Sequence, residues 1–391
     1  MNQFSRDNRL LGLSVLLWGI GDGLYIYIQP LYLSELGADP VAIGSILALA
    51  GAVMTVSHIP AGYLADHFGR KQVLVAGWCI ATLAALLMYL APSLPFFVVG
   101  LTISYFTGFV LSPISGYATE ARGAQSVQRA VTLVSAAYWT GSILSPTIGG
   151  WIGQVFGLRQ VYGVSVIAFV LSTSVVLLLK PQPLAPPTAG HTRYGALLSN
   201  RRLLGYLALT LAALSAMEIG IPLAPNFVVE RRGLDVGLVG VLGSVNSLGV
   251  VFLNVGFGQR APRRGFMMGQ VMIVMYLALL LFAPGSGWLV LAFLFRAGWN
   301  LTLNMAIAQV GRVVEPSQLG LAYGMVETVL GLALVVGPRI AGELYERDPS
   351  LPFRVSLALV VVTLPLAWWF APRRDAHSEA EVLPVPERRE A

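Results

Sequence analysis

Four ionisable side chains within long apolar stretches of this chain could do chemistry: Asp22, Glu218, Arg296 and Glu327. If these stretches cross a membrane, each charge costs roughly 2.5–3.5 kcal/mol to insert, so such residues are functional candidates. A buried carboxylate whose partner changes between two conformations could bind and release protons. We predict Asp22 and Glu218 equally as proton carriers, and Glu327 after them. The alternative is a static ion pair of Arg296 with Glu218 or Asp22.

Polar and aromatic side chains accompany these charges at helical spacing. Tyr25 and Gln29 lie three and seven residues after Asp22 and therefore share its helical face. A second polar stripe is formed by Asn300 and Asn304, which lie four and eight residues after Arg296. The residues predicted to line a wet interior are Tyr25, Gln29, Tyr105, Asn246, Arg296, Trp299, Asn300 and Asn304. Tyr27 and Trp139 could add aromatic surfaces for an aromatic or cationic ligand, and Pro222 and Pro225 could bend a gating helix.

The composition of the chain is typical of a protein that is embedded in a lipid membrane. The chain has 391 residues, of which 56% are hydrophobic and 11% charged, and its mean hydropathy is +0.72. Soluble domains carry about 25% charged residues. Apolar runs long enough to cross the hydrocarbon layer recur near residues 10–33, 40–65, 72–91, 95–118, 130–156, 160–180, 203–229, 236–259, 266–284, 287–311, 319–344 and 353–371. The sequence therefore predicts an all-α membrane protein with twelve transmembrane helices.

The runs fall into two sets of six. A Pro-rich stretch that begins at Pro181 separates them and cannot itself be a span. We predict a first six-helix bundle over 1–180, a cytoplasmic linker over 181–202, a second bundle over 203–372 and a disordered cytoplasmic tail over 373–391. Most Lys and Arg residues fall on the side that holds both termini. By the positive-inside rule this side is cytoplasmic, so the basic charge reflects topology and not nucleic-acid binding.

Several function classes are excluded or disfavoured. The single cysteine, Cys79, allows no internal disulfide. His58 is the one histidine within a span, so we predict no metal site, and no cofactor is expected. The chain has no phosphate-binding Gly-rich loop of the Walker type, which disfavours ATP-driven pumping. It also lacks a nucleophile elbow, which disfavours a membrane enzyme.

An internal repeat relates the two halves. Residues 37–44 resemble residues 233–240, and the same offset of 196 residues places Asp22 onto Glu218. Parallel repeats of this kind surround an axis normal to the membrane and enclose a central site.

The segment from Gly62 to Lys71 resembles the signature of the major facilitator superfamily between spans 2 and 3, and its residues at the signature positions are Gly62, Asp66, Gly69, Arg70 and Lys71. Glu120 and Arg122, after span 4, are predicted to join the cytoplasmic charge cluster of Asp66. In the second half the equivalent segment has Pro262 where Asp66 would fall. The contacts that hold the cytoplasmic side closed are therefore expected to be asymmetric between the two halves.

Span 5 carries Gly141, Ser145, Pro146, Gly149 and Gly150. This pattern is similar to the motif of the proton-coupled exporters of the superfamily, from which it departs at Ser145, where the exporters have Gly. Span 4 lacks the arginine common in the drug exporters. From the residues themselves, small side chains and a proline permit close helix contact and a kink.

The resemblance implies a monomeric secondary transporter that works by alternating access, with spans 1, 4, 7 and 10 around the cavity. We expect proton-coupled efflux, by antiport, of small amphipathic or cationic compounds. The alternative is a symporter or uniporter for a sugar, an organic acid or a lipid-like solute, because Arg296 beside Asn300 and Asn304 would suit an anion or polyol. The short loops favour a bacterial inner membrane.

Overall fold

The computed structural model describes residues 5–123, 125–182, 199–257, 262–310, 314 and 319–370. Its described residues form helices and no strand. The first half contains α1 (Arg6–Tyr25), α2 (Gln29–Glu35), α3 (Pro40–Phe68), α4 (Arg70–Leu90), α5 (Leu94–Phe106), the 3-10 helix η1 (Thr107–Val110), α6 (Leu111–Glu120), α7 (Val127–Phe156) and α8 (Leu158–Leu177). The second half contains α10 (Arg201–Glu218), α11 (Ala224–Arg232), α12 (Val236–Phe257), α13 (Pro262–Phe282), α14 (Gly287–Arg296), α15 (Gly298–Val310), α16 (Leu319–Arg347) and α17 (Leu351–Phe370).

These helices agree with the predicted spans. In the described part of the chain, nine helical stretches are long and apolar enough to cross a membrane, and α1 with α2, bent by 45°, forms a tenth. The α7 helix and the α10–α11 pair occupy the positions of the other two predicted spans. The predicted linker and tail lie mostly outside the described residues.

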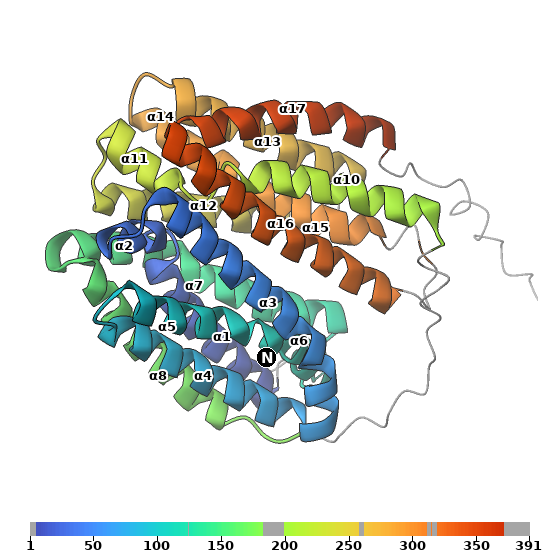
Figure 1. Ribbon diagram of the computed structural model, residues 1–391. Coiled ribbons are helices and arrows are strands. Elements are labelled where there is room, and N and C mark those ends of the chain that lie inside the picture. Colours follow the sequence, from blue (N-terminus) through green and yellow to red (C-terminus); the bar gives the residue numbers. More distant parts are fainter. Residues whose placement is uncertain are drawn as a thin grey trace, which may run out of the picture.

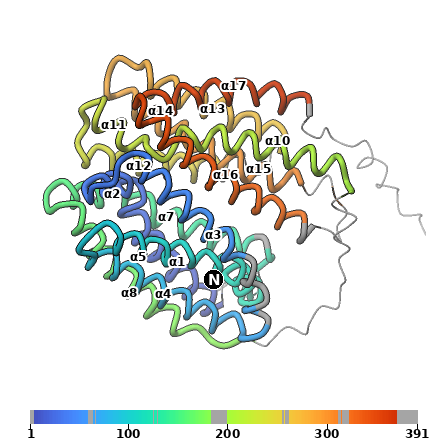
Figure 2. Tube along the Cα trace, viewed as in Figure 1, coloured from blue at the N-terminus to red at the C-terminus, as the bar shows by residue number. Residues whose placement is uncertain are grey.

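The two halves form two bundles that lie side by side, the first half from blue to green and the second from yellow to red (Figure 2). Each bundle has its own apolar clusters. One of them contains Trp78 and Tyr117 of the first half, and another contains Tyr206 and Phe266 of the second. A third cluster contains residues of both halves, among them Tyr32 and Phe353, so the two bundles also share apolar packing.

Spans 1 and 7 are broken at equivalent positions. The α1 helix ends three residues after Asp22, and α10 ends at Glu218. Pro30 lies in the first turn of α2, and Pro222 lies in the break before α11. Since proline cannot donate a backbone hydrogen bond, it fits the first turn of a helix and favours a kink or a break where it falls later. The sequence therefore sets an acidic residue beside a helix break in both halves.

Glycines bring the bundles into contact at the end that carries α2 and α11 (Figure 1). Gly44 of α3 lies against the backbone of Pro338 and Gly342 in α16. Gly240 of α12, its equivalent in the repeat, lies against the backbone of Pro146 and Gly150 in α7. At the same end, the Asn226 amide donates a hydrogen bond of 2.9 Å to Ser34. The side predicted to be extracellular is thus closed by two related helix pairs.

The contact between α1 and α7 allows a direct test of packing. A Cβ at Gly149 would overlap the carbonyl oxygen of Leu24, a backbone atom that cannot rotate away. We expect Gly149→Ala to lower the midpoint of thermal unfolding in detergent, because overpacking costs about 1–3 kcal/mol. Gly12→Ala in α1 is the control, since nothing lies within 4 Å of a Cβ there. An equal effect of the two substitutions would contradict the packing argument.

Candidate functional site

A cavity of about 280 Å³ lies between the two bundles. Its polar and charged lining residues are Gln29, Ser142, Glu218, Asn246, Ser247, Arg296 and Asn300. Its aromatic lining residues are Tyr27, Tyr105, Tyr138, Trp139, Phe293 and Trp299. The lining comes from broken spans 1, 7 and 10 and from α3, α5, α7, α12 and α16 of both bundles. Any change in the angle between the bundles must therefore change its shape.

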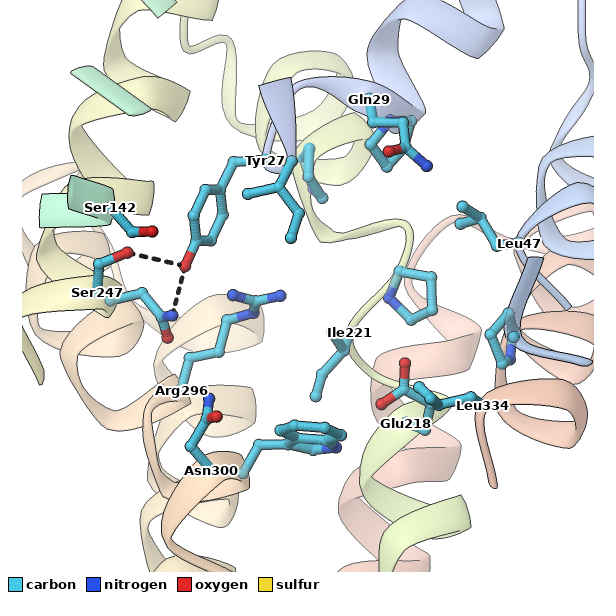
Figure 3. A pocket seen from close by; sticks show the side chains of 18 of the residues that line it. Tyr27, Gln29, Leu47, Ser142, Glu218, Ile221, Ser247, Arg296, Asn300 and Leu334 are labelled. Atoms are coloured by element: carbon cyan, nitrogen blue, oxygen red, sulfur yellow. Dashed lines mark hydrogen bonds between the residues drawn. The ribbon is translucent and has the colours of Figure 1, made fainter. Parts of the chain in front are cut away.

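Glu218 lies in the cavity wall at the end of α10. Its side chain is 7% exposed, and it packs against α16 at Gly337, where a Cβ would approach the Glu218 Cβ to 2.6 Å. Only glycine at position 337 therefore leaves room for the Cβ and Cγ atoms of Glu218 in this place. Figure 3 shows the carboxylate close to Leu334 and directed toward the open centre.

Arg296 lies across the cavity from Glu218 (Figure 3). No nitrogen of Arg296 comes within 4.0 Å of an oxygen of Glu218 or Asp22, all three being described residues. The guanidinium instead lies 5.3 Å from the centre of the Tyr27 ring and 5.9 Å from that of Phe293. The static ion pair considered from the sequence is therefore not formed in this structure, and both charges face the cavity.

Tyr27 connects the first bundle to this arginine. It lies in the break between α1 and α2, where its hydroxyl accepts a hydrogen bond of 2.7 Å from the Asn246 amide. The hydroxyl is also 3.3 Å from that of Ser247 (dashed lines in Figure 3). Because α12 supplies both partners, these contacts join the two halves at the cavity wall.

Asp22 lies behind the cavity wall and does not line it. Its carboxylate accepts hydrogen bonds of 2.9 Å from the Tyr25 hydroxyl and 2.6 Å from the Tyr138 hydroxyl. Tyr138 belongs to α7 and does line the cavity. Asp22 is therefore one hydrogen bond away from the cavity, whereas Glu218 is in it, although the repeat makes the two residues equivalent.

The structure brings together many of the residues expected from the sequence. The cavity contains Gln29, Tyr105, Glu218, Asn246, Arg296, Trp299 and Asn300 but not Asp22, Tyr25, Asn304 or Glu327. Tyr25 faces the first bundle, where its ring stacks on Tyr162 at 5.0 Å. Asn304 lies two helical turns below Arg296, roughly 12 Å along the axis, and span 10 is interrupted at Ala297. Glu327 is exposed on α16.

Sequence reasoning did not find Tyr138, Ser142 and Ser247. Tyr138 and Ser142 are four residues apart and so share the helical face of α7 that meets α1, where Ser142 donates a hydrogen bond of 3.1 Å to Gly19. That polar stripe in an apolar span was the available signal. Ser247 directly follows Asn246 and had no spacing of its own to mark it.

A comparison with protein families decides which fold this geometry represents. The family model of the Major Facilitator Superfamily matches residues 11–309. The chain belongs to the Major Facilitator Superfamily. It is therefore a multi-pass membrane transporter and not an enzyme.

Members of the superfamily resemble the chain over nearly its whole length. It is 23% identical to "Multidrug resistance protein 2" of Bacillus subtilis (strain 168), with 91% of this chain and 93% of that protein covered. It is 24% identical to "Quinolone resistance protein NorA" of Staphylococcus aureus (strain MRSA252), with coverage of 91% and 95%. Among solved structures, the nucleoside transporter NupG matches with a TM-score of 0.77 at 16% identity, covering 95% of this chain and 98% of that one. The D-xylose–proton symporter matches with a TM-score of 0.72 at 14% identity, covering 93% and 97%.

The superfamily signature lies at the end of the first bundle opposite α2. Gly69 has a φ of +88° and separates α3 from α4, a conformation that glycine adopts without strain. Arg70 donates a hydrogen bond of 3.2 Å to the carbonyl of Gly116 in α6, and Arg122 donates one of 2.9 Å to Thr119. The side chains at Gly62 and Asp66 lie outside the described residues. Arg70 thus ties the start of α4 to the end of span 4.

The span 5 motif packs α7 between α1 and α12. Gly141 and Gly149 lie against the backbone of Leu16 and Leu24 in α1. On the other side, Gly150 and the carbonyl of Pro146 meet Gly240. The Ser145 hydroxyl donates a hydrogen bond of 2.9 Å to Gly141 of its own helix. The motif therefore serves both the core of the first bundle and the contact between bundles.

Proposed function

We propose that this member of the superfamily is a secondary active transporter that works by alternating access and exports small amphipathic or cationic compounds in exchange for protons. One observation carries the proposal: the Glu218 carboxylate is buried, faces the cavity between the bundles and forms no ion pair with Arg296. In this proposal the protein works as a monomer in a bacterial inner membrane with both termini in the cytoplasm.

The position of Glu218 suits a site where a proton and a cation compete. A carboxylate in surroundings of low polarity favours a neutral state or a bound cation, because an isolated buried charge is costly. Glu218 lines the cavity that both bundles enclose, so rocking of the bundles would change its access to water. A proton that arrives from one side would displace the cation, and a cation from the other side would displace the proton.

The similar proteins support the direction of transport. Two of them carry names that refer to drug resistance, "Multidrug resistance protein 2" and "Quinolone resistance protein NorA". The aromatic lining provides flat apolar surfaces for amphipathic compounds. We therefore propose efflux and not uptake.

A second candidate function is symport or uniport of an organic acid, a sugar or a lipid-like solute. It is favoured by Arg296, whose guanidinium is a natural partner for a carboxylate. Asn300, Gln29 and Asn246 line the same cavity and offer amide groups for hydroxyls.

The test is proton movement in proteoliposomes that contain a pH-sensitive dye. We expect lipophilic cations to release protons from vesicles with an imposed pH gradient, and sugars and simple organic acids to release none. Empty vesicles control for leakage of the cations. Equilibration of a labelled solute without any proton movement would contradict antiport, and proton movement driven by sugars or organic acids would support the second function instead.

A further inference from the structure

The cavity presents two opposite charges that do not neutralise each other within it. The guanidinium of Arg296 and the carboxylate of Glu218 belong to α14 and α10 and lie on facing sides of the open space (Figure 3). Neither forms an ion pair of 4.0 Å or less with any described residue. The side chains of Ile221 and Trp299 also line the space, so apolar surface accompanies the two charges.

Polar atoms in the cavity wall also lack a hydrogen-bond partner within the described residues. The side-chain oxygens of Gln29 and Asn246 are buried without a hydrogen bond, and so is Nε of Arg296. Gln29 is 2% exposed and Asn246 3% exposed, and both line the cavity. The amide nitrogen of Asn246 is already used by Tyr27, which leaves its oxygen for another donor. Buried polar groups in proteins are nearly always hydrogen-bonded, so this wall is suited to a polar ligand.

We propose that the preferred substrates are zwitterions: compact molecules in which an aromatic or apolar body carries an anionic group at one end and a cationic group at the other. The anionic group pairs with Arg296, and the cationic group pairs with Glu218. This inference rests on the proposed function and names its substrate class.

Electrostatics favours a zwitterion over a singly charged compound. A simple cation at Glu218 leaves the Arg296 charge uncompensated in the same small space and is repelled by it. A simple anion at Arg296 meets the same difficulty with Glu218. A charge pair interacts more strongly in surroundings of low polarity than in water. A molecule that pairs with both residues therefore gains binding free energy from two charge pairs, whereas each singly charged analogue gains it from one.

The aromatic surfaces set the shape of the body that joins the charges. Tyr27 covers one side of Arg296, with its ring centre 5.3 Å from the guanidinium carbon. Tyr105 and Trp299 also line the cavity. A volume of about 280 Å³ is at the small end for ligand sites, which favours one ring system between the charges.

The experiment uses three compounds with one ring: 4-(aminomethyl)benzoate, benzylamine and benzoate, with naphthalene homologues to vary the spacing. Binding to the purified full-length protein in detergent is measured by calorimetry at fixed pH. We expect the zwitterion to bind at least about tenfold more tightly than either analogue (about 1.4 kcal/mol). Arg296→Gln should reduce its affinity to that of benzylamine, and Glu218→Gln should reduce it to that of benzoate.

The singly charged compounds show whether each variant is folded. Arg296→Gln should keep or improve benzylamine binding, and Glu218→Gln should keep or improve benzoate binding. Glu346→Gln and Arg347→Gln, at exposed positions outside the cavity, should leave all three affinities unchanged. The proposal is overturned if benzylamine binds as tightly as the zwitterion, if none of the compounds binds, or if one variant weakens all three equally.

Proton measurements separate this inference from the proposed function. Zwitterion binding that depends on both charges, with no proton movement in vesicles, contradicts antiport and supports the substrate class. Proton exchange driven equally by benzylamine and the zwitterion supports antiport and contradicts the substrate class.

Discussion

Glu218→Gln is expected to abolish substrate-dependent proton movement in proteoliposomes, while energy-independent exchange of labelled substrate persists at substrate concentrations high enough to offset the weaker binding of this variant. Glutamine keeps the shape of the side chain but cannot bind and release a proton, so transport can no longer respond to a pH gradient. The size of the effect follows from position, because among the described residues Glu218 is the carboxylate that lines the cavity between the bundles. The measurement is dye-reported proton release with and without the gradient.

The matched control for this experiment is Glu346→Gln, which removes an exposed carboxylate outside the cavity. It should leave coupling intact. Asp22→Asn in the same assay tests the second predicted carrier, which reaches the cavity through the Tyr138 hydroxyl. Full coupling in the Glu218 variant would refute its role as a proton carrier.

A disulfide between Thr147→Cys and Ser244→Cys is expected to stop transport completely. The hydroxyls of Thr147 and Ser244 are 2.7 Å apart and belong to α7 and α12, in different bundles. Side chains this close suit the Cβ separation of about 3.5–4.5 Å in a disulfide. Alternating access requires these two helices to separate, so a covalent link should hold the closed end of the cavity shut. Substrate transport is measured in vesicles before and after oxidation.

Cys79, exposed on α4, should be replaced by serine in all of these variants so that no other thiol reacts. Each single cysteine variant serves as a control and should transport with or without oxidant. Reduction of the double variant should restore transport. Normal transport in protein whose disulfide is confirmed by mass spectrometry would mean that α7 and α12 need not part.

Much of this architecture was determined by the sequence alone. Long apolar runs can satisfy their backbone groups in lipid only as helices, so the helical fold follows from composition. The repeat placed Asp22 and Glu218 at equivalent positions, and Pro222 and Pro225 indicated a bend in span 7, where α10 ends and α11 begins. Gly69 adopts the positive φ expected of a tight turn. These features depend on the residues of one segment alone, so they can be predicted from periodicity and composition.

The candidate site could be predicted only in part, because helical spacing gives the face of a residue but not what lies opposite that face. Only the tertiary structure placed Glu218 in the cavity and its repeat equivalent Asp22 behind Tyr138. It also turned Arg296 toward Tyr27 and away from an ion pair with either acid. Such choices depend on contacts between helices far apart in the chain, where glycines such as Gly240 and Gly337 set how closely the backbones approach.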